Sequence, residues 1–249
     1  MSHQRIVKLT SEQAALIPAY KERWINIALT TTPIDRQKAK ESVTAAYLIQ
    51  GLPEPEIIFF DSPDAAWNER LIQIINLPKK ERWQMIQEIQ LLTTNLETAL
   101  IYEIRYQLTP QIQDELLFYL HRELDIEPLL SNELNLMWTM FDSKSKKKVE
   151  TAKLSLATSG FCNLWAKAGA YLDFCINVLN CTIDQKRWII YQNLIANIGK
   201  LFPMKEQVVI CERPCKLLLD DENRFCVTSE PAVQFIDGYQ IHIPVRWLW

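Results

Sequence analysis

Residues 92–124 read LTTNLETALIYEIRYQLTPQIQDELLFYLHREL, and every fourth residue of this stretch is leucine or isoleucine. These aliphatic residues are Leu92, Leu96, Leu100, Ile104, Leu108, Ile112, Leu116, Leu120 and Leu124. An α-helix has about 3.6 residues per turn, so a four-residue spacing drifts by about 40° per step around a straight helix. Thr109 and Pro110 supply a stop and a restart in the middle. We therefore predict two helices, over about residues 80–107 and 110–124, that bury the stripe against different neighbours.

The four-residue spacing has two interpretations. It resembles an internal repeat that has partly decayed, of the kind found in stacked helices. Alternatively, it is a chance alignment of core leucines, because leucine is common and a spacing of four is close to the helical period. Both interpretations place the stripe in the core of the protein.

Upstream of this stretch the chain is mostly helical in pattern. Pro18 is expected to bend or split the first helix, which ends near residue 29. Thr32 followed by Pro33 predicts a helix start, and Gly51 predicts its end. Residues 56–60, EIIFF, form the best strand signal of the first half, and Asp61-Ser62-Pro63 opens another helix.

Downstream, residues 141–150 are the strongest loop or linker candidate. Two aromatic-rich helices are expected over about residues 161–180 and 184–201, the second entered through Thr182 and Gln185 at capping-box spacing. The last fifty residues then change to strand-like patterns, with strands expected over 207–211, 216–219, 225–227 and 232–235. Asp237-Gly238 predicts a hairpin turn, so the tail reads as a small antiparallel β unit.

The sequence therefore predicts an α+β fold that is predominantly α. We expect a repeat-like helical bundle with one short strand in the N-terminal half and a small C-terminal antiparallel β unit. The expected division is a helical domain over 1–201, with a loop break near 141–150, and a β unit over 202–249 packed on it.

The composition excludes several classes of function. The chain has 249 residues, a net charge of −3 and only five glycines, and it contains no glycine-rich phosphate-binding motif. A mildly acidic chain lacks the broad positive field of nucleic-acid-binding proteins. The run Lys146-Lys147-Lys148, with Lys144 beside it, is the one local candidate, but no aromatic residue interleaves it. A solvated loop is the favoured interpretation of that run, so nucleic acid is not an expected partner.

The N-terminal residues, the length of the apolar runs and the cysteines indicate a cellular compartment. The first residues, MSHQRIVKLTSEQ, lack the apolar region of a secretory signal, and no apolar run is long enough for a membrane span. All six cysteines lie after residue 161. We expect a cytoplasmic protein without membrane association, in which these thiols stay reduced.

Four charged residues are candidates for catalysis, although each has a simpler structural role available. Asp61 follows a predicted strand and Asp64 comes three residues later, so the pair could bind Mg²⁺ or act in acid–base chemistry. The alternative is a helix N-terminus, where a cap and a carboxylate are both favoured. Glu212 and Arg213 join them only if the fold brings all four into one cleft with perturbed pKa values.

Three cysteines are weak candidates for a zinc site. Cys211, Cys215 and Cys226 lack a CxxC pair, and the fourth ligand would have to be His242 or an upstream cysteine. Small buried hydrophobic side chains are the simpler interpretation. The sequence therefore predicts neither a metal nor a cofactor. The eight tryptophans fit core packing, with a groove for another protein as the functional alternative.

Several stretches resemble an uncharacterised bacterial family, chiefly cyanobacterial and known as a domain of unknown function. They are IAL (27–29), PIDR (33–36), EPEIIFFDSP (54–63), YLDFCINVLNC (171–181), CERP (211–214), ENR (222–224) and EPAVQFIDGY (230–239). Typical members carry Ser-Gln-Leu-x tetrads in the middle, which the four-residue leucine period of this chain resembles. Members also continue beyond the Asp-Gly-Tyr turn, so the resemblance implies a short or truncated member. It implies no reaction, cofactor or catalytic residue.

Two functions remain open on the sequence. The first is a non-catalytic interaction or scaffold protein whose partner is another protein, because no reaction motif appears and helical stacks present surfaces. The alternative is an uncharacterised hydrolase or nuclease-like enzyme that uses Asp61 and nearby acids. The sequence favours the interaction protein and leaves its oligomeric state open.

Overall fold

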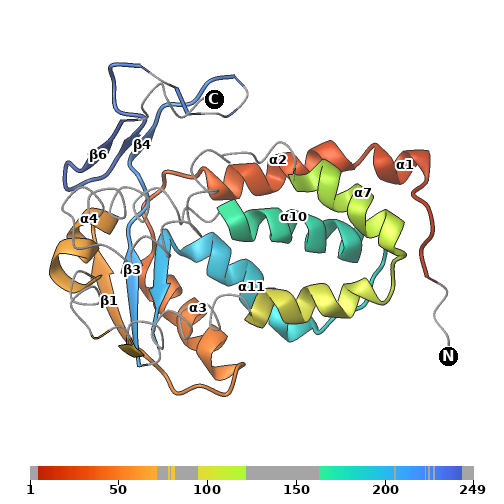
Figure 1. The fold of residues 1–249 in the computed structure, drawn as a ribbon, viewed down its shortest axis with the longest axis horizontal. Helices are drawn as coiled ribbons and strands as arrows, with labels where there is room; N and C mark the ends of the chain where they lie inside the picture. The colour runs from red at the N-terminus through yellow and green to blue at the C-terminus, as the bar shows by residue number, and fades with distance from the viewer. Residues whose placement is uncertain are drawn as a thin grey trace.

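A group of helices and a three-stranded sheet lie against each other, and a second small sheet follows at the C-terminal end of the chain (Figure 1). This computed structural model describes residues 5–71, 78, 80–81, 95–121, 163–204, 206–221, 223, 225–226 and 228–242. The predicted loop over 141–150, the lysine run, Cys162 and the last seven residues lie outside the described residues.

The sequence predicts the break between the first two helices correctly, but it does not predict where the third helix begins. α1 (Ser11–Ala14) and α2 (Ile17–Ala28) are separate helices, and Pro18 occupies the first turn of α2, which confirms the predicted split. α3 (Arg36–Leu48) begins at Arg36 and not at Pro33, so the predicted start was wrong. Asp35 caps it instead, because its carboxylate accepts hydrogen bonds from the backbone N–H groups of Gln37 and Lys38, both at 3.1 Å.

The four-residue stripe runs through two helices and the turn between them, as predicted for the described part. One helix covers residues 95–105 and the next is α7 (Pro110–His121). The buried positions of the stripe are Leu96, Leu100, Ile104, Leu108, Ile112, Leu116 and Leu120, each at most 4% exposed. Leu108 lies in the turn and forms a parallel β-bridge with Ile6. Because the helix is interrupted at this turn, the stripe stays on the buried side of both helices.

α10 (Asn163–Asn177) is the central helix, packed against α2, α7 and α11 (Gln185–Asn197) (Figure 1). Gly169 allows α2 to approach closely, because a Cβ there would lie 2.3 Å from the Trp24 ring. The capping box predicted from Thr182 for α11 was wrong. Asp184 is the N-cap and accepts a hydrogen bond from the backbone N–H of Arg187 at 3.1 Å.

The main sheet joins the two halves of the chain. β1 (Glu56–Phe60) pairs in parallel with β3 (Gln207–Cys211), and β2 (Lys200–Pro203) pairs antiparallel on the other side of β3. The strand over 56–60 is confirmed. The expectation that 207–211 belongs to the antiparallel tail was wrong, as was the helix extending to 201, because β2 begins at Lys200. The domain boundary expected after residue 201 therefore falls inside β2.

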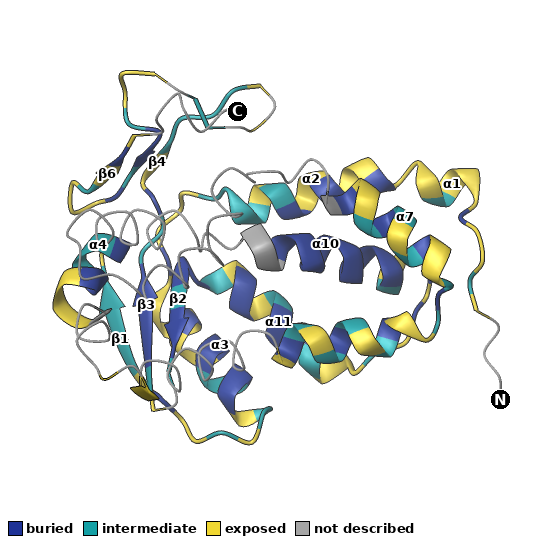
Figure 2. Ribbon diagram, viewed as in Figure 1, coloured by how far each residue is buried: buried dark blue, intermediate teal, exposed yellow. Residues whose placement is uncertain are grey.

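Both faces of this sheet are covered, which explains the burial of its central strand (Figure 2). Val208 and Ile210 of β3 belong to the large core shared with the helices. Val209 and Cys211 point to the other face, where they pack with Ala66 and Trp67. Ala66 ends α4 (Pro63–Ala66), and Trp67 begins the short π-helical turn η1 (Trp67–Leu71).

The small second sheet has the antiparallel order β4-β5-β6. Its strands are β4 (Lys216–Leu217), β5 (Val233–Gln234) and β6 (Gln240–Ile241). The predicted hairpin at Asp237-Gly238 is present, and Gly238 adopts a φ of 87°, which glycine accommodates without strain. Of the strand expected over 225–227, the structure describes Phe225 and Cys226, and Phe225 forms a single antiparallel bridge with Leu219.

The α+β, predominantly α class is confirmed by this arrangement. Helices carry most of the regular structure, and the strands are short and few in the described part of the chain. In that part, none of the helices combines the length and the apolar character needed to cross a bilayer.

Candidate functional site

The carboxyl ends of β1 and β3 bring two of the predicted site residues together. The strands are parallel and in register, with Phe60 opposite Cys211, so the residues that follow them leave the sheet at the same edge. The backbone N–H of Glu212 continues the ladder by donating to the Phe60 carbonyl at 2.8 Å. Asp61 and Glu212 therefore share the edge at which open α/β sheets commonly bind ligands.

The two aspartates at this edge make local contacts. Asp61 Oδ1 lies 3.2 Å from the guanidinium of Arg36, and both side chains are more than half exposed. Ser62, not Asp61, caps α4, because its Oγ accepts the backbone N–H of Ala65 at 3.0 Å. Asp64 accepts a hydrogen bond from the Asn68 amide at 2.9 Å. These geometries are typical of a helix N-terminus and an exposed ion pair.

Glu212 binds backbone groups with a single carboxylate oxygen. Its Oε1 accepts the N–H of Ile34 and the N–H of Arg213, both at 2.8 Å. Ile34 directly precedes Asp35, the N-cap of α3. The Glu212 carboxylate thus fixes the segment that enters α3 against the end of β3, and this explains why the helix starts later than the Thr32-Pro33 signal predicts.

Arg213 also binds the backbone of distant segments. Its Nε donates to the Ile198 carbonyl at 3.2 Å and its Nη1 to the Thr32 carbonyl at 3.1 Å, while Nη2 donates to the Ala196 carbonyl. Ala196 and Ile198 are at the C-terminal end of α11, where carbonyls lack helical partners and a cation is favoured. Arg213 therefore binds the carbonyls at the C-terminal end of α11 and links this end to the segment before α3.

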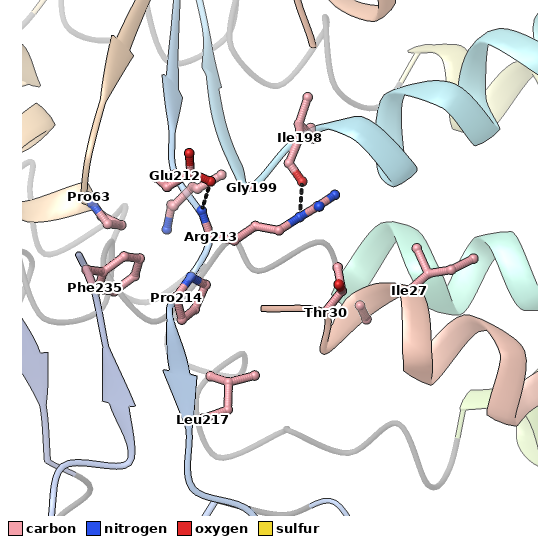
Figure 3. A pocket seen from close by; sticks show the side chains of 12 residues that line it. Ile27, Thr30, Pro63, Ile198, Gly199, Glu212, Arg213, Pro214, Leu217 and Phe235 are labelled. Atoms are coloured by element: carbon pink, nitrogen blue, oxygen red, sulfur yellow. Dashed lines mark hydrogen bonds between the residues drawn. The ribbon is translucent and has the colours of Figure 1, made fainter. Parts of the chain in front are cut away.

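The space around these residues is nearly filled (Figure 3). Its walls come from the end of α2, the sheet edge and the second sheet, and include Ile27, Thr30, Pro63 and Phe235. The cavity is about 10 Å³, which is room for about one water molecule. Gly199 contributes to the tight fit, because a Cβ there would lie 2.4 Å from the Cys211 carbonyl oxygen. Among the described residues, the edge holds backbone segments together and leaves a space that is too small for a substrate.

The three zinc candidates lie in different surroundings. Cys211 is fully buried on the face of the sheet that packs against Ala66 and Trp67, and burial raises the pKa of its thiol to about 12. Cys215 is exposed and its Sγ donates to the Gln234 carbonyl at 3.3 Å, while Cys226 is half-buried. Within the described ranges, no three His, Cys, Asp or Glu residues are grouped so that they could hold a metal ion.

A group of exposed aromatic side chains accompanies the buried stripe. Tyr102, Tyr106, Phe118 and Tyr119 are 49%, 66%, 51% and 50% exposed, and all belong to residues 95–121. Tyr102 and Tyr106 belong to the helix over residues 95–105 and the turn after it, and Phe118 and Tyr119 belong to α7; we call these four residues together the aromatic surface. Phe118 and Tyr119 are in edge-to-face contact with ring centroids 5.4 Å apart. The same segment that buries its aliphatic residues therefore presents its aromatic residues to solvent.

Sequence reasoning missed the attachment of this segment to the loop before α11. The Gln107 side chain donates to the Thr182 carbonyl at 2.6 Å and accepts the Thr182 N–H at 2.9 Å. Glu103 accepts the Asp184 N–H at 2.6 Å and also binds Arg187 at 3.2 Å. The predicted turn around Thr109 offered one signal, since a glutamine before a turn is well placed to bind a passing backbone. Its partner segment could not be inferred.

Comparison of the chain with protein-family models, with curated proteins and with solved structures finds no match.

The role of Arg213 can be tested by stability measurements. We expect Arg213→Met to lower the free energy of unfolding by about 2–4 kcal/mol, because it removes hydrogen bonds from a charged donor to three carbonyls. Denaturant unfolding followed by circular dichroism measures this loss. The matched control is Arg36→Met, which removes an exposed ion pair and should cost less than about 1 kcal/mol. Equal losses in both variants would contradict the assigned role.

Proposed function

We propose that this protein is a non-catalytic interaction protein and that its partner, another protein, binds the aromatic surface. The observation that carries the proposal is the exposure of Tyr102, Tyr106, Phe118 and Tyr119 on a segment whose aliphatic stripe is buried. Aromatic residues are enriched at protein interfaces and dominate their binding energy, since they bury a large area at low entropic cost. A buried stripe beneath them provides a rigid support.

The way this segment is attached supports the same conclusion. The Glu103–Arg187 ion pair fixes the helix over residues 95–105 to α11, and Gln107, in the turn after that helix, binds Thr182 in the loop before α11. α7 packs on α2 and α10. Because both helices are held from behind, little conformational freedom would be lost when a partner covers their outer faces.

The enzyme alternative has less support. Asp61 and Glu212 share a sheet edge, as a catalytic pair would, but Asp61 is bound to Arg36 and one Glu212 oxygen is bound to two backbone N–H groups. The adjoining cavity has room for about one water molecule. A hydrolase or nuclease-like site at this edge would need a larger opening. We further propose a cytoplasmic location, which agrees with the free thiols of the described cysteines.

The proposal is tested by placing a photo-reactive amino acid at single positions of the full chain. We expect the substitutions at Tyr102 and Phe118 to give the same crosslinked partner in extracts of the source cells. The control position is Leu48 of α3, which is 59% exposed but lies outside the aromatic surface. Crosslinking of the same protein with equal yield at Leu48, or of none at Tyr102 and Phe118, would contradict the proposal.

Once the partner is in hand, its affinity provides a quantitative prediction. We expect Tyr102→Ser combined with Tyr106→Ser to weaken binding at least about tenfold, because aromatic anchors at interfaces contribute about 2 kcal/mol or more. Titration calorimetry measures the affinity. Leu48→Ser should leave it unchanged, and both variants should keep the free energy of unfolding within about 1 kcal/mol, since the replaced side chains are exposed.

A further inference from the structure

Cys175 and Cys181 form a thiol pair for which the proposed function has no use. Cys175 is in the last turn of α10 and is fully buried, and Cys181 lies in the loop that leads to α11. Asn180 adopts a left-handed conformation with a φ of 55°, which turns the chain back toward the helix. As a result, the backbone N–H of Cys181 donates to the Cys175 carbonyl at 2.9 Å.

This turn brings the backbones of the two residues together. In a hydrogen-bonded antiparallel pair the α-carbons lie about 5.5 Å apart, and natural disulfides join α-carbons that are about 4.4–6.8 Å apart. The two thiols lie close enough for each to shift the pKa of the other.

The two thiols differ in reactivity. The hydrogen bond from Cys175 lowers the pKa of the Cys181 thiol, whereas burial raises the pKa of the Cys175 thiol. Cys181 is only 5% exposed, but its neighbours Asn180 and Thr182 are both exposed in the loop. A small oxidant therefore needs only a local movement of the loop to reach Cys181. An activated thiol beside a resolving thiol is the usual arrangement of oxidation-sensitive cysteines.

We propose that Cys175 and Cys181 are an oxidation site at which hydrogen peroxide forms an intrachain disulfide. In the first step the Cys181 thiolate attacks a peroxide oxygen; an S–O bond forms, the O–O bond breaks, and hydroxide leaves. Protonation of that hydroxide gives water, and Cys181 becomes a sulfenic acid. The Cys175 sulfur then attacks the Cys181 sulfur; the S–S bond forms, the S–O bond breaks, and the departing hydroxide takes the Cys175 proton as a second water.

The sequence allows a direct test on the purified full chain. Trypsin releases residues 168–186 as one peptide that contains both cysteines and no internal lysine or arginine. After treatment with hydrogen peroxide, we expect this peptide to be lighter by two hydrogen atoms and to resist thiol alkylation under denaturing conditions. Dithiothreitol should restore both thiols. The buried Cys211 serves as the internal control and should be oxidised at least about tenfold more slowly.

Variants separate the two roles. Cys175→Ser, whose hydroxyl can still donate a hydrogen bond to Cys181, should leave a sulfenic acid on Cys181 that a dimedone reagent traps. Cys181→Ser should reduce oxidation of Cys175 at least about tenfold. The control Cys215→Ser removes an exposed thiol outside the pair and should not alter disulfide formation.

Two results would overturn the assignment. One is that both thiols stay alkylatable while Cys215 is oxidised. The other is that Cys175→Ser gives no trapped sulfenic acid in a folded protein. Because these readouts are peptide masses from the purified protein, they do not depend on the interaction partner.

Discussion

Replacing Asp173 with alanine is expected to lower the free energy of unfolding by about 3–5 kcal/mol. Its carboxylate is 1% exposed and lies inside the helical core, where three side chains bind it. Trp24 Nε1 donates to it at 2.9 Å, the Asn177 amide at 2.6 Å, and Arg23 forms an ion pair at 3.1 Å. Removing the acceptor leaves the buried indole N–H of Trp24 without a partner, and an unsatisfied buried donor is costly.

Two further variants show whether this loss comes from the hydrogen bonds. Asp173→Asn keeps the shape but places an NH₂ group against one of the donors, so we expect about 2–3 kcal/mol. Asp61→Ala removes an exposed carboxylate from an ion pair and should cost less than about 1 kcal/mol. Denaturant unfolding measures all three. If Asp173→Ala cost no more than Asp61→Ala, the packing of α2 on α10 would not depend on this carboxylate.

Local signals in the sequence were sufficient where the structure is decided within a few residues. Pro18 separates α1 from α2 because it lacks the N–H that a continuous helix would use. The run over 56–60 becomes β1, and Asp237-Gly238 forms the hairpin because glycine accepts the positive φ. In each case the deciding group is in the segment itself.

Local signals failed where a distant residue competes for the backbone. Thr32 and Pro33 resemble a helix start, but Glu212 binds the Ile34 N–H and Arg213 binds the Thr32 carbonyl. The start of α3 is therefore delayed to Arg36. Thr182 likewise fails to cap α11 because Gln107 binds its N–H and its carbonyl. Tertiary hydrogen bonds of this kind leave no trace in the capped segment itself.

The candidate site shows the same division. A residue that follows a strand is expected at the edge of a sheet, and this places Asp61 and Glu212 correctly. Asp61 and Glu212 are neighbours because β1 pairs in parallel with β3, and these strands are about 150 residues apart in the sequence. The role of Arg213 could not be predicted, because its partners are backbone carbonyls of Thr32, Ala196 and Ile198. Carbonyls are present at every residue and give no pattern to search for.

Within residues 95–121, one set of side chains contributes to stability and another set to the proposed binding. The aliphatic stripe faces the core and the aromatic surface faces solvent, so the two sets of side chains can be changed independently. A chance alignment of leucines would also be buried within each helix. It would not require Leu108, in the turn between the helices, to be fully buried and bridged to Ile6. The stripe is therefore continuous through this turn, as a decayed repeat predicts.

We therefore expect Leu108→Ala and Leu116→Ala to cost similar amounts, about 2–5 kcal/mol each, although only Leu116 lies in a helix. Both side chains are fully buried, and truncation removes their transfer energy and leaves a cavity. Phe118→Ala is the matched control in the same segment. It removes a larger side chain that is 51% exposed, so it should cost less than about 1 kcal/mol despite its size.

Denaturant unfolding of the three variants shows whether the loss in free energy of unfolding follows the burial or the size of the removed side chain. Burial predicts that Leu108→Ala and Leu116→Ala both exceed Phe118→Ala. A small loss for Leu108→Ala alone would mean that the stripe stops at the end of the first helix, and the repeat would then be an accident of two separate cores. A large loss for Phe118→Ala would mean that the aromatic surface is part of the core, which would remove the support for a binding role. Since the two contradicting outcomes concern different residues, one set of unfolding curves tests both the continuity of the stripe and the exposure of the aromatic surface.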